Sequence, residues 1–244
     1  QGVALAARLQ NVKATIVMPF DAPKSKADNT IALGAEIVFY DRYTESREEI
    51  ARNLADKNGA FLIPAYDHYD VICGQGTVGM EAFHQMANIG RSLDRFYCPI
   101  GGGGLMAGSS SALNLFSSDT EVIGVEPESL NDTQKSLISG RRERIKTQPN
   151  TLCDSLMAEI PGEITFKINQ KLISYIDTVT DQQVIDAMRI VFNEFGLTVE
   201  PGGAVSLAAA MSTIAKKSVG PDENIVVVLS GGNISKERHR KLIN

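Results

Sequence analysis

The sequence predicts an α/β fold whose sheets are built from parallel strands. Short apolar segments of strand length alternate with amphipathic segments of helix length, and runs of glycine follow two of the apolar segments. Strands separated by helices need right-handed crossovers, which place them side by side in parallel. The predicted strands span residues 14–18, 36–40, 60–63, 95–100, 121–125 and 224–229. The predicted helices begin at Gln1 and then span residues 24–33, 46–58, 71–88, 105–116, 131–139, 181–195 and 203–216.

A turn-rich stretch at residues 64–69 predicts the boundary between two domains. The smaller domain would span residues 1–65 and the larger one residues 66–244. The basic segment 140–149 (GRRERIKTQP) is expected to be a solvated connection, because runs of charge usually serve only to solvate a loop.

Composition and charge exclude several classes of protein. The 244 residues carry 24 Lys and Arg against 29 Asp and Glu, a net charge of −5, which argues against binding to nucleic acid or anionic membranes. No apolar run approaches the roughly 18 residues that span a bilayer. The 3 cysteines are scattered, which predicts neither a disulfide framework nor a zinc site and favours a reducing, cytoplasmic setting. The three histidines have no metal-like spacing and are expected to be surface or packing residues: His68, His84 and His239.

The sharpest motif is the glycine run 101–104, which lies between a predicted strand and a predicted helix. Without Cβ atoms, successive backbone N–H groups can converge on one anion, and the helix directs its positive end at the same point. No Lys-Ser or Lys-Thr pair follows, so the run is not a Walker A loop, and it lacks the dinucleotide fingerprint. The pattern predicts a monophosphate site.

A second glycine motif, residues 230–233 (SGGN), follows the last predicted strand. Ligands of open parallel sheets bind beyond the carboxyl ends of the strands. Both glycine motifs stand at such ends, so we expect them to line one crevice, in which Ser230 could offer its hydroxyl to a ring nitrogen. A plain turn at residues 230–233 stays an open alternative.

Five motifs together resemble one enzyme family. They are PIGGGGLMAG (99–108), GQGTVGMEA (74–82), GVEPES (124–129), VEPGGA (199–204) and VLSGGN (228–233). In this order and spacing they are similar to the threonine and serine dehydratases that use pyridoxal phosphate (PLP). The resemblance covers essentially the whole chain. It implies PLP fold type II, which is like the tryptophan synthase β chain, with two parallel-sheet domains of which the first part is missing here.

The resemblance implies PLP as the cofactor and a small amino acid as the substrate. The implied reaction is a β-elimination that converts L-threonine or L-serine to a 2-oxo acid and ammonia. Alternatives within the family are a serine or aspartate racemase and a threo-3-hydroxyaspartate ammonia-lyase. The residues implied to hold the cofactor are Gly101, Gly102, Gly103, Gly104, Leu105, Ser230, Asn233 and Glu200.

The start of the chain is unusual, because Gln1 leads directly into a helical pattern without Met or an N-cap residue. In the family, QGVA follows an SGNH-type segment, and the lysine that forms the Schiff base with PLP lies before that. No lysine of this chain stands in a matching context. We therefore expect a fragment that is inactive by itself. A catalytically silent protein that binds a phosphate ligand is the alternative from another class.

Further residues are carried over from the family. In the serine racemase branch, a divalent cation is bound at positions that correspond here to Glu126, the Leu130 carbonyl and Asp132. Oxygen ligands of this kind suit Mg²⁺ or Ca²⁺. Acidic residues that complement a helix N-terminus are an equally weighted alternative.

Two residues are implied at the substrate. Arg47 matches an arginine that reaches a substrate carboxylate in racemase-like members, although on its helix it could also be simply solvated. Asp154 matches an A-D-G segment near the substrate, with Ser155 in place of the glycine. We also expect a homodimer or homotetramer.

Overall fold

The computed structural model describes residues 1–145, 151–216 and 218–244, which divide into two units. The first unit spans Gln1–Ile63 and the second spans Pro64–Asn244. Every strand pair in both units is parallel, so the predicted α/β class with parallel sheets is confirmed. Of the predicted loop 140–149, residues 140–145 are described and residues 146–149 lie outside the described residues.

The first unit is a small α/β unit around a two-stranded sheet, in which Thr15 lies opposite Glu36. The Ser46 hydroxyl accepts a hydrogen bond from the Glu49 amide at 3.2 Å and so caps the last helix of the unit, which Gly59 ends in a left-handed conformation at φ 59°. The elements are α1 (Gly2–Leu9), β1 (Thr15–Pro19), α2 (Lys24–Ala32), β2 (Glu36–Tyr40) and α3 (Arg47–Asn58).

The prediction of a strand at residues 60–63 is wrong. These residues form no strand, and the sheet of the first unit consists of β1 and β2 in the described part of the chain. Phe61 is 78% exposed, which is unusual for the centre of an apolar strand. An apolar run becomes a strand only where another strand offers it hydrogen-bonding partners, and periodicity does not reveal whether one does.

The second unit is built on a four-stranded sheet in the order β5-β4-β3-β6. Sequence reasoning missed β5, an edge strand of this sheet that carries Asp177 in its centre. A strand at an edge does not require the continuous apolar pattern of a central one, and the polar centre of β5 breaks that pattern. The strands are β3 (Arg95–Pro99), β4 (Glu121–Pro127), β5 (Tyr175–Val179) and β6 (Ile225–Val227).

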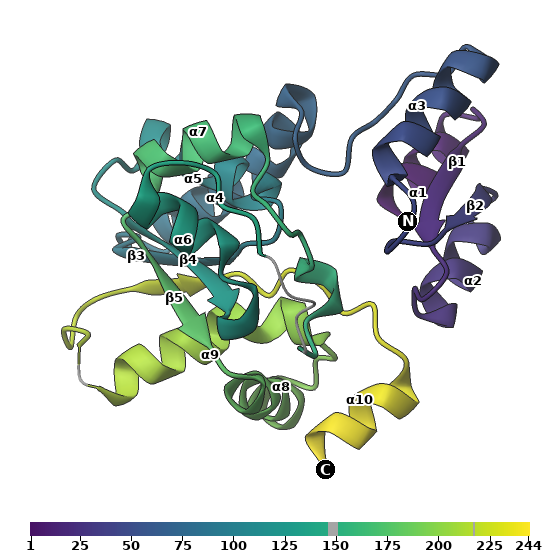
Figure 1. Ribbon diagram of the computed structural model, residues 1–244. Coiled ribbons are helices and arrows are strands. Elements are labelled where there is room, and N and C mark those ends of the chain that lie inside the picture. Colours follow the sequence, from purple (N-terminus) through teal and green to yellow (C-terminus); the bar gives the residue numbers. More distant parts are fainter. Residues whose placement is uncertain (146–150, 217) are drawn as a thin grey trace. The chain divides into compact units, whose positions relative to one another are not determined.

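Helices cover both faces of this sheet (Figure 1), α4, α5 and α7 on one face and α8 and α9 on the other. Successive residues of β3 point to opposite faces, so Phe96 packs in the core on the α5 side, whereas Tyr97 packs against α8 and α9. The helices are α4 (Tyr69–Asn88), α5 (Gly104–Phe116), α6 (Asp132–Ser139), α7 (Glu163–Leu172), α8 (Asp181–Phe195), α9 (Pro201–Ala215) and α10 (Lys236–Ile243), with short 3₁₀ turns η1 (Glu128–Leu130) and η2 (Asp154–Leu156). Sequence reasoning missed α7 and α10.

Candidate active site

The two glycine motifs lie at the same edge of the second unit's sheet. Gly101 follows β3 and Ser230 follows β6, and these two strands are neighbours, with Tyr97 opposite Val227. From β3 the chain crosses on the α5 face to β4, whereas it reaches β6 from α9 on the other face (Figure 1). The carboxyl ends of β3 and β6 therefore flank a topological switch point, where open α/β sheets bind ligands.

In the glycine run, neighbouring residues bind the backbone carbonyls, whereas backbone amides are left without acceptors in the described part of the chain. The Gly102 carbonyl accepts bonds from the Thr165 hydroxyl at 2.7 Å and the Gly162 amide at 3.2 Å. The Gly103 carbonyl accepts from the Ala107 amide of α5 at 2.8 Å and from the Asn169 side-chain amide at 3.4 Å. By contrast, the amides of Gly102 and Gly103 have no acceptor within the described residues. Next to the N-terminus of α5, these amides form a cradle for an anion.

Packing also requires glycine in this run. Gly103, the N-cap of α5, has φ +93°, which a side chain rarely tolerates. A Cβ atom on Gly102 would lie 2.4 Å from the ring of Tyr66, and one on Gly101 would lie 3.3 Å from the Cα atom of Leu156. Neighbouring residues thus leave little room for a side chain at Gly101 or Gly102.

The SGGN segment lies against the start of α9. The Glu200 amide donates to the Gly231 carbonyl at 3.0 Å, and a Cβ atom on Gly203 would lie 2.4 Å from that same oxygen. Glu200 is 9% exposed, while Ser230 is exposed and Asn233 half-buried. The second glycine motif therefore packs on the VEPGGA segment, so that two of the five motifs are joined in space.

Glu126 and Asp132 form a buried carboxylate pair at the start of α6. The Glu126 carboxylate accepts bonds from the Thr133 amide at 3.0 Å and the Gln134 amide at 2.9 Å, so it caps this helix. Burial and the neighbouring Asp132 raise the pKa of Glu126 to about 8, and burial raises the pKa of Asp132 to about 7. Leu130, whose carbonyl is the third implied ligand, is itself buried.

A cation at this pair would have few protein ligands. In the described part of the chain, no cluster of three or more His, Cys, Asp or Glu side chains could hold a metal ion. Two carboxylates and a carbonyl would need water to complete the shell, which Mg²⁺ and Ca²⁺ accept.

The two implied substrate residues are not brought together in one unit. Arg47 begins α3 of the first unit, and its guanidinium lies 2.6 Å from the Glu48 carboxylate. Asp154 begins η2 of the second unit and lies 3.5 Å from Arg238 of α10. Because η2 also contacts Gly101 through Leu156, Asp154 belongs to the surroundings of the glycine loop.

The three histidines cap a helix or pack against aromatic rings. The His68 ring accepts a hydrogen bond from the Asp70 amide at 3.2 Å at the start of α4. His84 contacts the rings of Phe83 and Phe116, and His239 is buried against Phe192. All three therefore cap or pack, in line with the prediction of surface or packing roles.

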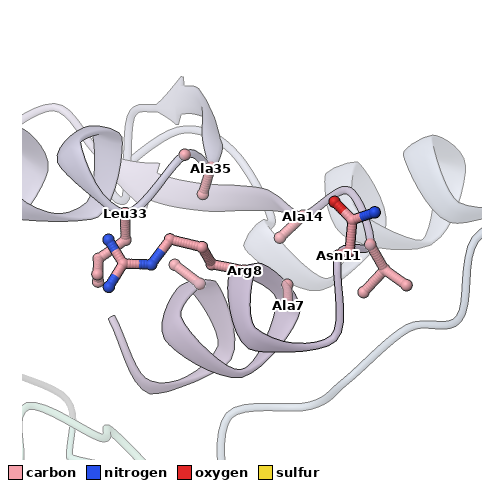
Figure 2. A pocket seen from close by; sticks show the side chains of 9 residues that line it. Ala7, Arg8, Asn11, Ala14, Leu33 and Ala35 are labelled. Atoms are coloured by element: carbon pink, nitrogen blue, oxygen red, sulfur yellow. The ribbon is translucent and has the colours of Figure 1, made fainter.

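A hollow of about 190 Å³ in the first unit contains none of the predicted site residues. Figure 2 shows Ala7 and Arg8 of α1 on one side and Leu33 and Ala35 on the other, with Arg8 extended toward Leu33. Most of the residues that line it are small and apolar, so it offers little chemistry beyond the Arg8 guanidinium and the Asn11 carboxamide.

Sequence reasoning missed Tyr66, Thr165 and Asn169, which lie against the glycine loop, and Asp67, which binds the N-terminus of α7. Thr165 and Asn169 lie 63 and 66 residues from the glycines whose carbonyls they bind. No local pattern could have found them, because α7 itself carries no motif. Asp67 follows an apolar run before a helix and could only have been taken for a local cap.

Comparison with known proteins decides the family. The family model of pyridoxal-phosphate dependent enzymes matches residues 1–231. The chain belongs to this family. The glycine loop, the switch point and the five motifs thus belong to a chain of the PLP family, and the predicted recognition is confirmed.

Individual members of the PLP family are similar over the whole chain. The L-threo-3-hydroxyaspartate ammonia-lyase of Saccharomyces cerevisiae is 41% identical over 244 residues, which are 100% of this chain and 72% of that protein. The serine racemase of Schizosaccharomyces pombe is 36% identical over 100% of this chain and 73% of its own length. Among solved structures, the processed form of threonine deaminase isoform 2 from Solanum lycopersicum superposes with a TM-score of 0.90 at 33% identity, covering 99% of this chain and 69% of that one. The predicted PLP fold type II is confirmed by such structures.

No helix in the described residues is both long and apolar enough to cross a membrane.

Proposed function

We propose that the intact protein catalyses the PLP-dependent β-elimination of a hydroxy amino acid to a 2-oxo acid and ammonia. One observation carries the proposal: in a chain of the PLP family, the amides of Gly102 and Gly103 stand without acceptors among the described residues at the N-terminus of α5, while their carbonyls are held from behind. This arrangement fits a phosphate monoester, because it supplies only donors and leaves no Cβ atom in the way. Relatives of the chain act on hydroxyaspartate, threonine and serine, as their names state.

The roles of the residues follow from their positions. Gly101 to Gly104, with the Leu105 amide, would hold the cofactor phosphate. Ser230 would face the ring nitrogen, with Asn233 and Glu200 shaping the pocket around it. A hydroxyl, unlike a carboxylate, does not keep a proton on this nitrogen, which makes the ring a weaker electron acceptor and favours elimination over transamination.

Two residues are proposed to act on the substrate. Arg47 would bind a carboxylate of the substrate, and Asp154 would lie near the reacting end. PLP, when bound, supplies the electron-withdrawing ring that lets the Cα proton leave. We propose residues 1–65 as the small domain and residues 66–244 as the PLP-binding domain, in a homodimer or homotetramer that works in the cytoplasm.

A substrate panel tests the reaction. Protein expressed as its gene encodes it is incubated with PLP and L-threonine, L-serine or L-threo-3-hydroxyaspartate, and ammonia, 2-oxo acid and D-isomer are measured. Ammonia and 2-oxo acid in equal amounts support the proposal. D-isomer as the main product would favour the racemase instead, and no turnover together with phosphate binding would favour a silent binding protein.

The Schiff-base amine is tested separately. No lysine among residues 1–244 stands in the sequence context of the family's Schiff-base lysine, so we propose that none of them serves as that amine. Borohydride reduction in the presence of PLP, followed by peptide mapping, locates the modified lysine. A stoichiometric phosphopyridoxyl group on one lysine of residues 1–244 would contradict this.

We also propose that Glu126, the Leu130 carbonyl and Asp132 bind Mg²⁺ or Ca²⁺. The support is chemical: two buried carboxylates lie together with raised pKa values, and among the described residues the positive charge that acts on the pair is that of Lys135. Such a pair is costly in a fold unless a proton or a cation neutralises it. Calorimetric titration with CaCl₂ or MgCl₂ measures this directly, with Glu126→Gln as the variant that should not bind.

A further inference from the structure

Asp67 binds the N-terminus of a helix that lies far from it in the sequence. Its carboxylate accepts hydrogen bonds from the amides of Glu163 at 2.7 Å, Ile164 at 2.8 Å and Thr165 at 3.1 Å. These are the first three amides of α7, which have no partner within the helix. A Cβ atom on Gly162 would lie 2.4 Å from the Asp67 carboxylate, so glycine is what allows this close approach.

The same helix holds the glycine loop. The Thr165 hydroxyl, in the first turn of α7, donates to the Gly102 carbonyl at 2.7 Å. One turn further along, Asn169 donates to the Gly103 carbonyl at 3.4 Å. Thr165 and Asn169 are 0% and 1% exposed, so water does not compete for these bonds.

Holding a carbonyl also directs the next amide. In a planar trans peptide, the C=O of one residue and the N–H of the next point in opposite directions. Because the Gly102 carbonyl faces α7, the Gly103 N–H points away from α7. The Gly103 carbonyl accepts the first bond of α5, from the Ala107 amide at 2.8 Å, in addition to the longer bond from Asn169, so the Gly104 N–H is oriented mainly by α5 itself. The position of α7 thus sets the direction of the Gly103 amide and supports that of the Gly104 amide.

We propose that Asp67 is a positioning residue for the cofactor phosphate, which acts through α7 on the amides of the glycine loop. This inference rests on the proposed phosphate cradle. Asp67 does not touch the anion. It fixes the start of α7, Thr165 of α7 holds the Gly102 carbonyl, Asn169 adds a bond to the Gly103 carbonyl, and the Gly102 carbonyl directs the Gly103 amide. Without the carboxylate, the first turn of α7 loosens and the amides no longer converge on one point.

A pair of ligands without an aldehyde isolates the phosphate from Schiff-base chemistry. Pyridoxine 5′-phosphate and pyridoxine differ only in the phosphate group, and their dissociation constants are measured by calorimetry or by competition. The ratio of the two constants reports what the cradle contributes. For Asp67→Ala we expect this ratio to fall about tenfold, which corresponds to about 1.4 kcal/mol, while the affinity for pyridoxine itself stays unchanged.

Two sets of variants separate positioning from general loss of stability. The Thr180 hydroxyl accepts a hydrogen bond from the Gln183 amide at 3.2 Å and so caps α8. This helix belongs to the same unit but lies on the other face of the sheet, and Thr180→Ala removes its cap. It should lower the melting temperature without changing the ratio. Thr165→Val should lower the ratio as Asp67→Ala does, and Thr165→Ser, which keeps the hydroxyl, should restore it.

The outcomes distinguish the two levels of the argument. If the wild-type protein binds pyridoxine 5′-phosphate no more tightly than pyridoxine, the phosphate cradle and with it the proposed function fail. If the wild-type protein discriminates and Asp67→Ala discriminates equally well, the cradle stands and the role of Asp67 is overturned. A change in ratio for Thr180→Ala as large as that for Asp67→Ala would likewise overturn it, because any loss of stability would then suffice.

Discussion

Two helices of the second unit begin on a carboxylate that lies outside the helix, and they differ in what surrounds it. Glu126 caps α6 from only seven residues before Thr133, is 0% exposed, and lies beside a second buried carboxylate, Asp132. Asp67 caps α7 from 96 residues before Glu163 and is partly exposed. Two carboxylates at one buried helix end carry more negative charge than the helix needs, which makes that end suitable for a cation. At the N-terminus of α7, the single carboxylate of Asp67 accepts the hydrogen bonds of the helix amides, and this helix in turn binds the neighbouring glycine loop.

The largest expected effect is at the buried cap. Glu126→Ala leaves the amides of Thr133 and Gln134 without an acceptor in a region closed to water, which should lower the free energy of unfolding by about 3 kcal/mol. Urea denaturation measures it. Glu128, which is exposed in η1, is the matched control, and Glu128→Ala should change stability by less than about 0.5 kcal/mol. An equal loss for both variants would contradict the role of Glu126 as the cap.

The cap on α7 should be worth less. Asp67→Ala is expected to lower the free energy of unfolding by about 1.5 kcal/mol, because the amides that it uncovers are partly accessible to water. Asp67→Asn keeps an acceptor oxygen and should lose about half as much. The exposed Asp70 in the first turn of α4 provides the control variant Asp70→Ala. If Asp67→Asn were as unstable as Asp67→Ala, charge rather than the acceptor oxygen would govern the cap.

Added cation should separate the two helix ends. At a concentration ten times the dissociation constant, Ca²⁺ or Mg²⁺ should stabilise the wild-type protein by about 1.4 kcal/mol. Asp67→Asn should keep the whole of this stabilisation, whereas Glu126→Gln should lose it. Thermal unfolding with and without EDTA measures the difference. Stabilisation of Glu126→Gln to the wild-type extent would place the cation elsewhere.

The smallest effect is expected at the second carboxylate of the pair. In the absence of cation, Asp132→Asn should raise the free energy of unfolding by about 1 kcal/mol, because it removes a buried charge next to Glu126 and keeps the shape of the side chain. One oxygen of Asp132 is buried without a hydrogen-bond partner among the described residues, so little is lost with it. Chemical denaturation in EDTA checks the sign. A clear loss of stability would mean that the Asp132 carboxylate supports the fold.

Predictions from the sequence succeeded where a signal is local. The alternation of strands and helices, the glycine run between β3 and α5 and the family could all be read from residues that are neighbours in the chain. Predictions failed at residues 60–63, where an apolar run has no strand to pair with among the described residues, and at β5, where an edge strand has a polar centre. Strand formation depends on a partner strand, which the segment itself does not encode.

The amino-acid sequence alone is enough to predict a phosphate-binding loop after β3, since glycine is the residue type that leaves backbone amides uncovered and tolerates the φ of +93° at Gly103. The direction in which those amides point is a property of the folded chain. For the Gly103 amide it depends on the hydrogen bond from Thr165 to the Gly102 carbonyl, which Asn169 supports one residue further along, and the helix that carries Thr165 and Asn169 begins on Asp67. These bonds join residues 63 to 98 positions apart, so folding, and no local preference, brings them together.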